Sequence, residues 1–436
     1  MKIIKQMMLV TLFLILIISI ANAQGIPKAT RPELVGLSKE RLQRISTWIQ
    51  EDVDKGIVPG AVVMVLRKGK IAYYEAFGYR DREKKIPMTR DSIFRVASMT
   101  KPFTSLAIMM LAEEGKIQLP VPVSRYLPEF KDLKVGVEKK DPASDKTELV
   151  LETPSREMTI LDLLRHTSGL TYGFMGKSMV KNRYNEVKAF DFNQTNAELV
   201  TKLSKLPLQY HPGMTWDYSQ STDVLARIVE VISGVEFDTF IAERIAKPLK
   251  LADTGFWVEG VDRQARIAEP QINPATGQRP PMIPDVTKKP KWMSGGAGLV
   301  STAHDYARFC LMFLNGGILD RVRLVSRKTI EHMTSNHIPP GYKYAVPVQS
   351  QIMWPSPSLE TGQGFGSGFA INCEPGLSPL PGSKGDYYWT GIFGTYFWID
   401  PKEQLIAILM YQTGPGTLNI PYEHRMRYFV YQAISD

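Results

Sequence analysis

The sequence predicts an α+β protein in which a sheet is built from both ends of the chain and a mainly helical part is inserted between them. Strand-like apolar runs occur at residues 60–76 and return only at residues 365–412. Between these regions, apolar residues mostly recur at the three- and four-residue spacing of an amphipathic helix. The clearest helical patterns lie at residues 196–206, 222–233 and 237–249.

The chain has 436 residues, enough for two domains or one large composite domain. We expect a sheet domain formed by residues 24–105 together with residues 290–436. A mainly helical domain is expected at residues 106–289.

The N-terminus shows the pattern of a signal peptide at residues 1–23. Lys2 and Lys5 precede an apolar run at residues 7–20, and small residues come just before Gln24. We expect cleavage before Gln24 and export to the periplasm or the medium, with no stable membrane anchor afterwards. A retained anchor is the alternative, but the apolar run is shorter than the roughly 20 residues of a membrane span.

The formal net charge is +9, and without Lys2 and Lys5 it becomes +7, from 51 basic and 44 acidic side chains. This excess is spread over many segments. Short basic runs such as residues 288–291 are typical of solvated loops. We therefore expect no nucleic-acid partner. The sequence leaves the oligomeric state open.

Two cysteines, Cys310 and Cys373, lie far apart in the sequence. Cys310 falls on an apolar helical pattern. We expect two free thiols rather than a disulfide.

The first expected helix spans residues 38–53, where apolar residues recur at helical spacing and Ser38 is the N-cap. It should lie against a sheet. Two strand-like runs, residues 60–67 and 70–76, flank Lys68-Gly69 and predict a β-hairpin.

Residues 131–157 are rich in charged and turn residues, so we expect an exposed insertion. A short helix is expected at residues 158–170, with Thr159 as its N-cap and His166 near its C-terminus. We interpret His166 as a residue that ties down this turn rather than a catalytic one. Late strands are expected at residues 365–372, 387–390, 395–399 and 405–412, followed by a last helical stripe at residues 426–433.

Ser98 and Lys101 form the most informative short pattern in the chain. They precede an apolar helical segment at residues 104–114. Because residues three apart share a helix face, the Lys101 amine can reach the Ser98 hydroxyl, which places a base beside a nucleophile. Burial of this helix should lower the pKa of Lys101. The Ser98 amide, at the helix N-terminus, could also donate to a developing oxyanion.

A second pair with the same spacing, Ser178 and Lys181, lies in a polar stretch flanked by glycine and lysine. We expect no buried helix after it and no partner motif near it. We interpret this pair as a chance match.

Tyr218 lies in a turn just before the helical pattern at residues 222–233. A nearby lysine ammonium favours the phenolate form of a tyrosine. Tyr218 could therefore take the Ser98 proton, or pass a proton to a leaving group.

Residues 388–394 form a strand edge that contains Trp389, Gly391 and Ile392. Glycine at such an edge permits close approach of the backbone to a ligand. The Ile392 amide is a candidate second oxyanion donor, beside the Ser98 amide.

Taken together, these motifs resemble the serine β-lactamase and penicillin-binding-protein superfamily, in its class C β-lactamase and family VIII carboxylesterase branch. The resemblance covers residues 24–436 as one catalytic unit. Its motifs are the Ser98/Lys101 pair, residues 164–170, residues 212–219, residues 294–302 and Trp389-Thr-Gly391. It implies a β-lactamase/transpeptidase-like fold, with an antiparallel sheet flanked by helices and a helical domain. It also implies that the site lies in the cleft between them.

Two positions depart from the β-lactamase pattern. Gln220 stands where those enzymes carry asparagine, and Trp389 stands where they carry a lysine. Both changes are common in the esterase branch. They put β-lactam turnover in doubt while keeping acyl transfer from Ser98 intact.

The function that the resemblance implies is a secreted serine hydrolase that cleaves small carboxylic esters through a Ser98 acyl-enzyme. Lys101 and Tyr218 complete the predicted catalytic group, and Trp389, Gly391 and Ile392 are the predicted contacts to substrate or oxyanion. The substrate would be a small ester or amide. A β-lactamase, D-amino-acid peptidase or acyltransferase on the same site is one alternative. A non-catalytic sensor that binds wall peptides or β-lactams is another.

Two other hydrolase classes lack their signatures in this sequence. No Gly-x-Ser-x-Gly elbow of a Ser-His-Asp hydrolase occurs. The six histidines also never lie four apart on a helix with a glutamate between them, as a zinc protease requires. No metal or other cofactor is implied.

Overall fold

The computed structural model describes most of the chain after the N-terminal segment. The described residues are 25–142, 146–273, 276–280, 283–338, 342–344, 361–414 and 422–436. The predicted signal peptide and its cleavage position lie outside them.

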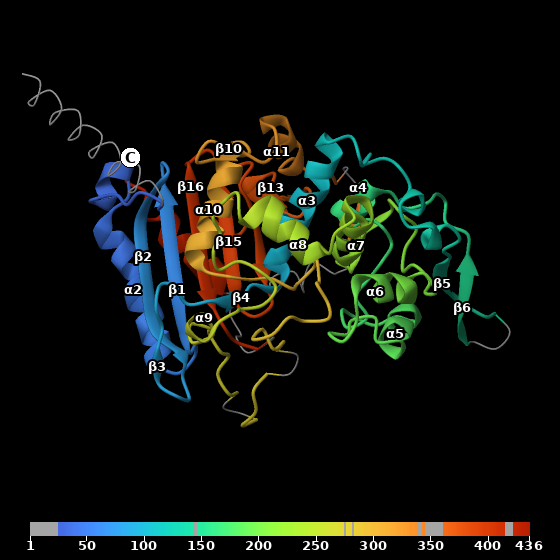
Figure 1. The fold of residues 1–436 in the computed structure, drawn as a ribbon, viewed down its shortest axis with the longest axis horizontal. Helices are drawn as coiled ribbons and strands as arrows, with labels where there is room; N and C mark the ends of the chain where they lie inside the picture. Colours follow the sequence, from blue (N-terminus) through green and yellow to red (C-terminus); the bar gives the residue numbers. More distant parts are fainter. Residues whose placement is uncertain are drawn as a thin grey trace, which may run out of the picture.

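A sheet of eight antiparallel strands forms the body of the protein, and β1 (Gly60–Arg67) and β16 (Leu405–Tyr411) pair along its middle (Figure 1). This pairing joins the two ends of the chain, with Ala61 opposite Tyr411. The predicted fold class is confirmed. In spatial order the strands are β12 (Gln363–Phe365), β13 (Ala370–Asn372), β14 (Tyr387–Gly391), β15 (Thr395–Asp400), β16, β1, β2 (Lys70–Asp81) and β3 (Ile86–Pro87).

Local sequence explains the first hairpin of this sheet. β1 and β2 are joined by Lys68 and Gly69, which both adopt positive φ, 51° and 73°. Two such residues make a turn whose twist matches that of the flanking strands. The hairpin predicted around Lys68-Gly69 is therefore confirmed.

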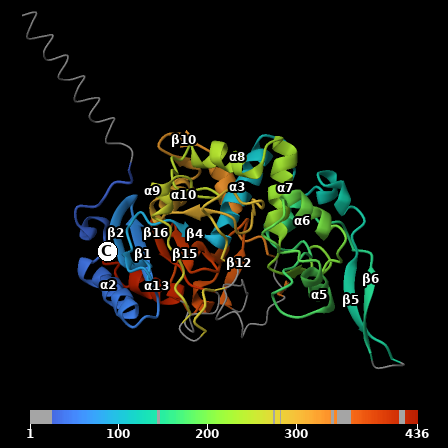
Figure 2. The ribbon, with the colours of Figure 1, turned by 60° about the horizontal axis from the view of Figure 1, so that its bottom comes forward.

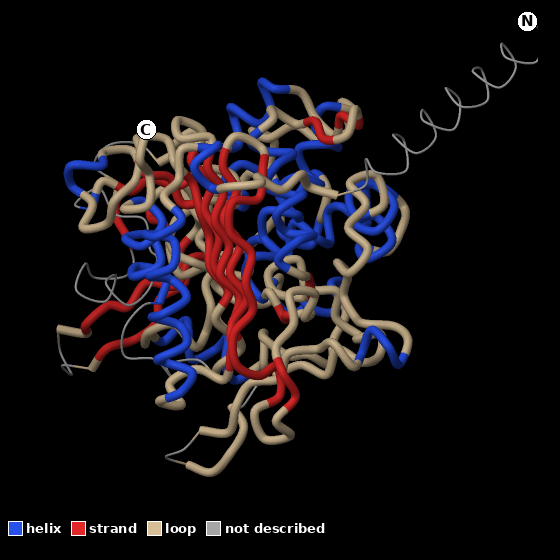
Figure 3. Tube along the Cα trace, turned by 90° about the vertical axis from the view of Figure 1, so that its left-hand side faces the viewer, coloured by secondary structure: helices blue, strands red, loops and turns tan. Residues whose placement is uncertain are grey.

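Helices cover both faces of the sheet. On one face lie α2 (Lys39–Asp54) and α13 (Tyr422–Tyr431), and on the other lies α10 (Ala303–Leu314) (Figures 2 and 3). Every residue of the central strands β1, β15 and β16 is buried, as expected for strands covered on both sides. Ser38 caps α2, as predicted, because its Oγ accepts from the Arg41 amide.

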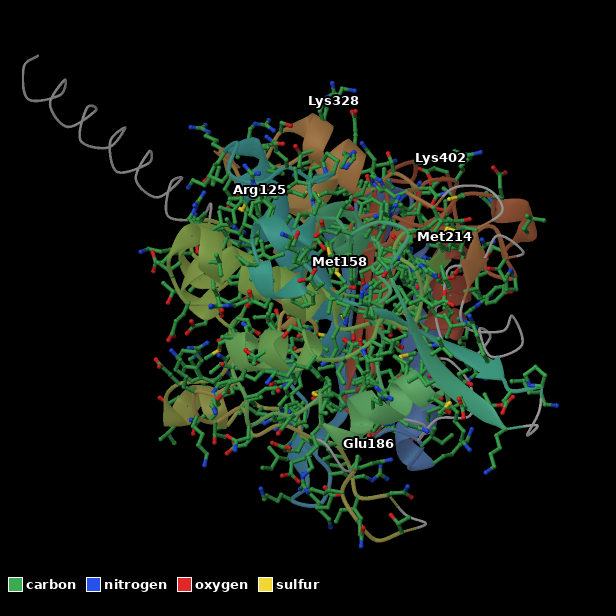
Figure 4. All side chains as sticks on the ribbon, turned by 90° about the vertical axis from the view of Figure 1, so that its right-hand side faces the viewer. Arg125, Met158, Glu186, Met214, Lys328 and Lys402 are labelled. Atoms are coloured by element: carbon green, nitrogen blue, oxygen red, sulfur yellow. The ribbon has the colours of Figure 1, made fainter. Side chains whose placement is uncertain are left out.

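The helical part lies to one side of the sheet and faces the viewer in Figure 4, with Met158 near its centre and Glu186 below it. α3 (Lys101–Glu113) runs between this part and the sheet, against α7 (Ser221–Ser233). The remaining α-helices are α4 (Ile160–Leu164), α5 (Met179–Glu186), α6 (Asn196–Leu203), α8 (Phe237–Ile241), α9 (Val261–Gln264) and α11 (Arg327–Met333).

Short elements complete the described structure. The π turn is Ala242–Ala246, and the 3-10 turns are Pro32–Val35, Ala97–Thr100, Val123–Arg125, Pro128–Phe130 and Pro375–Leu377. The strands outside the main sheet are β4 (Phe94–Arg95), β5 (Val135–Lys140), β6 (Thr147–Glu152), β7 (Thr215–Trp216), β8 (Val300–Ser301), β9 (Ile318–Leu319), β10 (Val322–Arg323) and β11 (Lys343–Tyr344).

The predicted exposed insertion at residues 131–157 contains a hairpin, β5 and β6, that projects from the helical part (Figures 1 and 2). Most of its residues are exposed, as predicted. Its base is attached, because the Gly136 amide donates to the Leu208 carbonyl.

Two predicted elements are interrupted by a residue with positive φ. The helix expected at residues 158–170 has only the five residues of α4, capped by Thr159 as predicted, because His166 adopts a positive φ of 57°. The strand expected at residues 365–372 is two strands, β12 and β13, joined by a turn in which Gly368 has a φ of 87°. Both helix and strand need negative φ, so each element ends there.

Short backbone pairings join the segment just before Ser98 to the end of the middle segment. β4 pairs with β8, and isolated bridges join Ile93 to Ile267 and Gly255 to Val300. The division of the chain at residues 105/106 and 289/290 stays a prediction.

Both cysteines are free thiols, with Cys310 buried and Cys373 half-buried. Within the described ranges, no helix has the length and apolarity needed to cross a membrane.

Candidate active site

Ser98 lies in the 3-10 turn Ala97–Thr100, which runs directly into α3. Ala97, just before it, adopts a positive φ of 44°, a strained conformation for a residue with a side chain. Neighbouring segments hold this turn in place, since the Val96 amide donates to the Leu299 carbonyl and Thr395 Oγ1 donates to the Val96 carbonyl. The half-buried Ser98 side chain is thus presented on a fixed backbone.

Lys101, one turn further on, is 1% exposed. Its Nζ lies 3.2 Å from Ser98 Oγ and donates to the Gly296 carbonyl at 2.8 Å. Burial lowers the pKa of Lys101 to about 7, because the ammonium is denied water. A neutral amine is therefore available near neutral pH to take the Ser98 proton.

Tyr218 lies between β7 and α7, and its ring is in contact with Lys101. Lys101 Nζ is 4.5 Å from the ring centroid. The prediction that Lys101 favours the phenolate form of Tyr218 is wrong. Burial raises the pKa of Tyr218 well above its ordinary value, and hydrogen bonding to Ser98 and Trp389 opposes this only in part. Tyr218 is therefore a neutral phenol, suited to donating a proton.

The sequence suggested that Trp389 contacts the substrate, but its side chain is buried and offers no surface to one. The side chain is 1% exposed and packs against Tyr218 and Phe365, with ring centroids 5.4 Å apart in both pairs. Its indole Nε1 donates to Tyr218 Oη at 3.4 Å. Trp389 therefore acts on the site through Tyr218.

Gly391 ends β14 beside the Ser98 turn, and Ile392 is the first residue of the turn that follows. β14 is an interior strand rather than an edge strand, but β13 pairs with it only at Tyr387 and Tyr388, so residues 389–391 have no partner strand on that side among the described residues. A Cβ on Gly391 would lie 2.4 Å from the Val96 carbonyl oxygen. The close approach that this glycine permits is therefore to the Ser98 turn.

The two predicted oxyanion donors are the amides of Ser98 and Ile392. Neither amide donates to another group in the part of the chain that the structure describes. Both residues are half-buried. Free amides beside a nucleophile can stabilise the negative charge that develops on a carbonyl oxygen.

Asp223 on α7 is a buried carboxylate that sequence patterns did not identify. Its Oδ1 accepts from Ser294 Oγ at 2.6 Å and from the Gly296 amide at 3.0 Å. Gly296 thus contacts Asp223 through its amide and Lys101 through its carbonyl. Burial raises the pKa of Asp223, and the charge of Lys101 opposes that shift. The sequence does show an acidic residue at the start of the helix after Tyr218. Its spacing does not reveal that this residue lies near Lys101 in the folded chain.

His166 lies in the turn after α4 and ties this turn to residues 217 and 219, which agrees with the predicted structural role. Its carbonyl accepts from the Asp217 amide, and its Nδ1 lies 3.2 Å from Ser219 Oγ. Burial, with a further contribution from Lys101, holds the pKa of His166 well below its ordinary value. The ring is therefore neutral, and it packs 4.9 Å from the Tyr218 ring centroid.

The second Ser/Lys pair has a structural role. Ser178 caps α5, and its Oγ accepts from the Lys181 amide. Of the eight residues of α5 only Val180, Lys181 and Tyr184 are buried, so α5 is not a buried helix like the one after Ser98. Lys181 Nζ donates to the Met175 carbonyl, and Ser178 Oγ donates to Gln209 Oε1 at 2.5 Å. This pair cannot act as a nucleophile and its base.

Among the described residues, no group of three or more His, Cys, Asp or Glu side chains is placed to hold a metal ion.

Comparison with known proteins identifies the family. The Beta-lactamase family profile matches residues 45–426. An uncharacterized protein of Mycobacterium tuberculosis (strain CDC 1551 / Oshkosh) is 34% identical over 381 residues, which cover 84% of this chain and 89% of that protein. Esterase EstB of Burkholderia gladioli is 28% identical over 391 residues, covering 85% of this chain and 90% of EstB.

A solved structure of the same fold is that of EstCE1, a hydrolase with promiscuous acyltransferase activity. It superposes with a TM-score of 0.72 and 26% sequence identity, over 90% of this chain and 99% of that chain. This chain therefore belongs to the beta-lactamase family and is an enzyme of the serine β-lactamase and penicillin-binding-protein superfamily.

Proposed function

We propose that this enzyme is an exported serine hydrolase that cleaves small carboxylic esters through an acyl-enzyme on Ser98. The observation that best supports this is the buried Lys101 amine, 3.2 Å from Ser98 Oγ and with a pKa of about 7. An ordinary lysine is protonated at neutral pH and cannot act as a base. Lys101 is largely neutral there, so its amine can accept the hydroxyl proton of Ser98.

In the acylation step, Lys101 accepts the Ser98 proton while Ser98 Oγ bonds to the ester carbonyl carbon. The carbonyl oxygen gains negative charge and is stabilised by the amides of Ser98 and Ile392. The carbon–alkoxy bond then breaks. Tyr218 donates its phenolic proton to the leaving alkoxide and regains a proton from Lys101, so the alcohol leaves neutral.

Deacylation reverses these transfers with water as the nucleophile. Lys101, neutral again, takes a proton from water while the water oxygen bonds to the acyl carbon. The Ser98 Oγ–carbon bond breaks, and Ser98 recovers its proton through Tyr218. The products are a carboxylic acid and the free enzyme.

An ester is favoured over a β-lactam by the residue at position 389. Trp389 has no charge with which to hold a substrate carboxylate, and its indole N–H is already donated to Tyr218. Two of the similar proteins are an esterase and a hydrolase with promiscuous acyltransferase activity, which agrees with acyl transfer from an ester. β-Lactamase, D-amino-acid peptidase and acyltransferase activities remain the alternatives on the same site.

The test has two parts. Labelling with a fluorophosphonate, followed by peptide mapping, should modify Ser98, whereas a purely binding protein would leave it unmodified. The purified enzyme should then be measured on matched p-nitrophenyl esters, p-nitroanilides, D-alanyl-D-alanine peptides and a chromogenic cephalosporin. Highest kcat/KM on the esters supports the proposal, and highest kcat/KM on any other group would replace it.

Export is proposed from the N-terminal segment alone. The protein recovered from an extracytoplasmic fraction should begin at Gln24. A membrane-bound product that still begins at Met1 would instead make residues 7–20 an anchor.

A further inference from the structure

A continuous row of aromatic side chains leads away from the candidate active site. Tyr172 contacts Phe174 and Phe190, with ring centroids 5.0 and 6.1 Å away. Phe190 in turn contacts Phe192 at 5.4 Å and Trp292 at 5.2 Å. We call Tyr172, Phe174, Phe190, Phe192 and Trp292 the aromatic row.

The inner end of the aromatic row touches the residues that handle the proton. The Tyr172 ring centroid lies 5.4 Å from that of Tyr218 and 5.8 Å from Lys101 Nζ. Tyr172 is buried. It therefore holds this end of the aromatic row close to Lys101, whose Nζ is hydrogen-bonded to Ser98 Oγ.

Two rings of the aromatic row are exposed to solvent. Phe174 is 49% exposed and Phe192 is 39% exposed. Among the described residues, these are the only phenylalanines in the set of exposed large apolar side chains. Leaving two such rings in water costs free energy, and exposed apolar surface next to a reactive site indicates binding of an apolar group.

Gln220 ties the aromatic row to the tyrosine motif. Its Nε2 donates to the Ala189 carbonyl at 2.8 Å, and Gln194 Nε2 donates to the same carbonyl at 3.0 Å. Ala189 immediately precedes Phe190. A second bond holds the backbone next to Phe174, because Nδ2 of Asn185 on α5 donates to the Gly173 carbonyl at 2.9 Å. The backbone next to Phe190 is therefore held by the buried amides of Gln220 and Gln194, and the backbone next to Phe174 by the exposed Asn185 amide.

We propose that the aromatic row is a binding surface for an extended apolar chain of the substrate, and that Gln220 positions this surface relative to Tyr218. This inference rests on the proposed ester hydrolysis and adds the substrate class: esters with a long alkyl or an aryl group, on either the acyl or the alcohol side. Gln220 does not touch the reacting atoms and acts as a positioning residue.

The experiment measures how kcat/KM changes with chain length. One arm uses p-nitrophenyl acetate, butyrate and hexanoate, and the other uses ethyl, butyl and hexyl acetate. Each methylene that is buried contributes about 4-fold, so the ratio of longest to shortest substrate should reach at least about 10-fold in one arm. The arm that shows it identifies the acyl or the alcohol side.

Phe174→Ala and Phe192→Ala should each lower that ratio by about 3-fold or more, because each removes an exposed ring of the row. Gln220→Ala should lower it as well, by releasing the Ala189–Phe190 backbone. The matched control is Tyr428→Ala, which removes an exposed aromatic side chain on α13. Its ratio should equal that of wild type.

A ratio that is the same in wild type, Phe174→Ala and Phe192→Ala would overturn the inference. A second outcome would also overturn the inference: the variants change their oligomeric state while the longest-to-shortest substrate ratio stays the same. The aromatic row would then be a contact with another protein molecule rather than with substrate. Rates of Ser98 labelling by ethyl and octyl fluorophosphonates give the same ratio without ester turnover. If the enzyme hydrolyses no ester but is still labelled faster by the octyl than by the ethyl reagent, the proposed function is wrong and the binding surface stands.

Discussion

Trp389 donates its indole N–H to the hydroxyl oxygen of Tyr218. This bond occupies an acceptor site on the phenol, so the phenolic hydrogen is directed to another group. The pKa of Tyr218 lies well above its ordinary value because the residue is buried, and the phenol keeps its proton at neutral pH. Tyr218 is thereby defined as a proton donor, with the neutral Lys101 amine as the base.

Ser98→Ala should abolish ester turnover and fluorophosphonate labelling, because it removes the nucleophile. Residual activity above about a thousandth of wild type would contradict the mechanism. Ser178→Ala is the control, since it alters the second Ser/Lys pair. It should keep its activity while losing about 1 kcal/mol of stability, the usual cost of removing an N-cap.

The pH dependence of kcat/KM should report the ionisation of Lys101. Only the neutral amine can take the Ser98 proton, so kcat/KM should rise with pH through about 7 and then level off. Lys101→Ala should lower kcat/KM by at least about 10²-fold. A wild-type profile that is flat between pH 5 and 9 would exclude Lys101 as the base.

Asp223→Asn should move this rise to lower pH. The negative charge of Asp223 raises the pKa of Lys101 and opposes the effect of burial, so its removal lets the pKa fall further. The control is Asp54→Asn, which changes an exposed carboxylate on α2 and should leave the profile in place. An unchanged profile in Asp223→Asn would show that the carboxylate only holds the Ser294–Gly296 loop.

Tyr218→Phe should slow acylation by at least about 10²-fold, since a positioned acid is lost while the ring is kept. Pre-steady-state release of p-nitrophenol measures acylation separately from deacylation. If Tyr218→Phe acylated at nearly the wild-type rate, Lys101 would have to supply both the base and the acid.

Wild-type enzyme should favour a short p-nitrophenyl ester over a chromogenic cephalosporin by at least about 10²-fold in kcat/KM. Trp389→Lys should narrow this gap, because the narrow, flexible lysine side chain can turn out of the buried position of the indole and reach the cephalosporin carboxylate. The charge-assisted hydrogen bond that it then forms contributes about 1.5–3 kcal/mol. Trp389→Phe is the matched control, as it removes the N–H without adding a charge and should keep the gap. Equal turnover of ester and cephalosporin by wild type would assign the enzyme to the β-lactamases instead.

Local sequence was sufficient wherever an element depends on its own residues. Ser38 predicted the start of α2, and Lys68-Gly69 predicted the β1–β2 turn, because capping and turn conformation involve only neighbouring residues. It was insufficient at His166 and Gly368, where positive φ ends an element that apolar spacing alone would extend.

By itself the sequence determined the fold class, and it brought together Ser98 and Lys101, because three residues of helix place two side chains on one face whatever surrounds them. Only the tertiary structure decided the protonation states and the partners of these side chains. Lys101 has a pKa of about 7, Tyr218 is a neutral phenol, and Trp389 is turned inward onto that phenol. Burial and electrostatic attraction depend on which distant segments pack together, and β14, α3 and α7 meet only when the chain is folded.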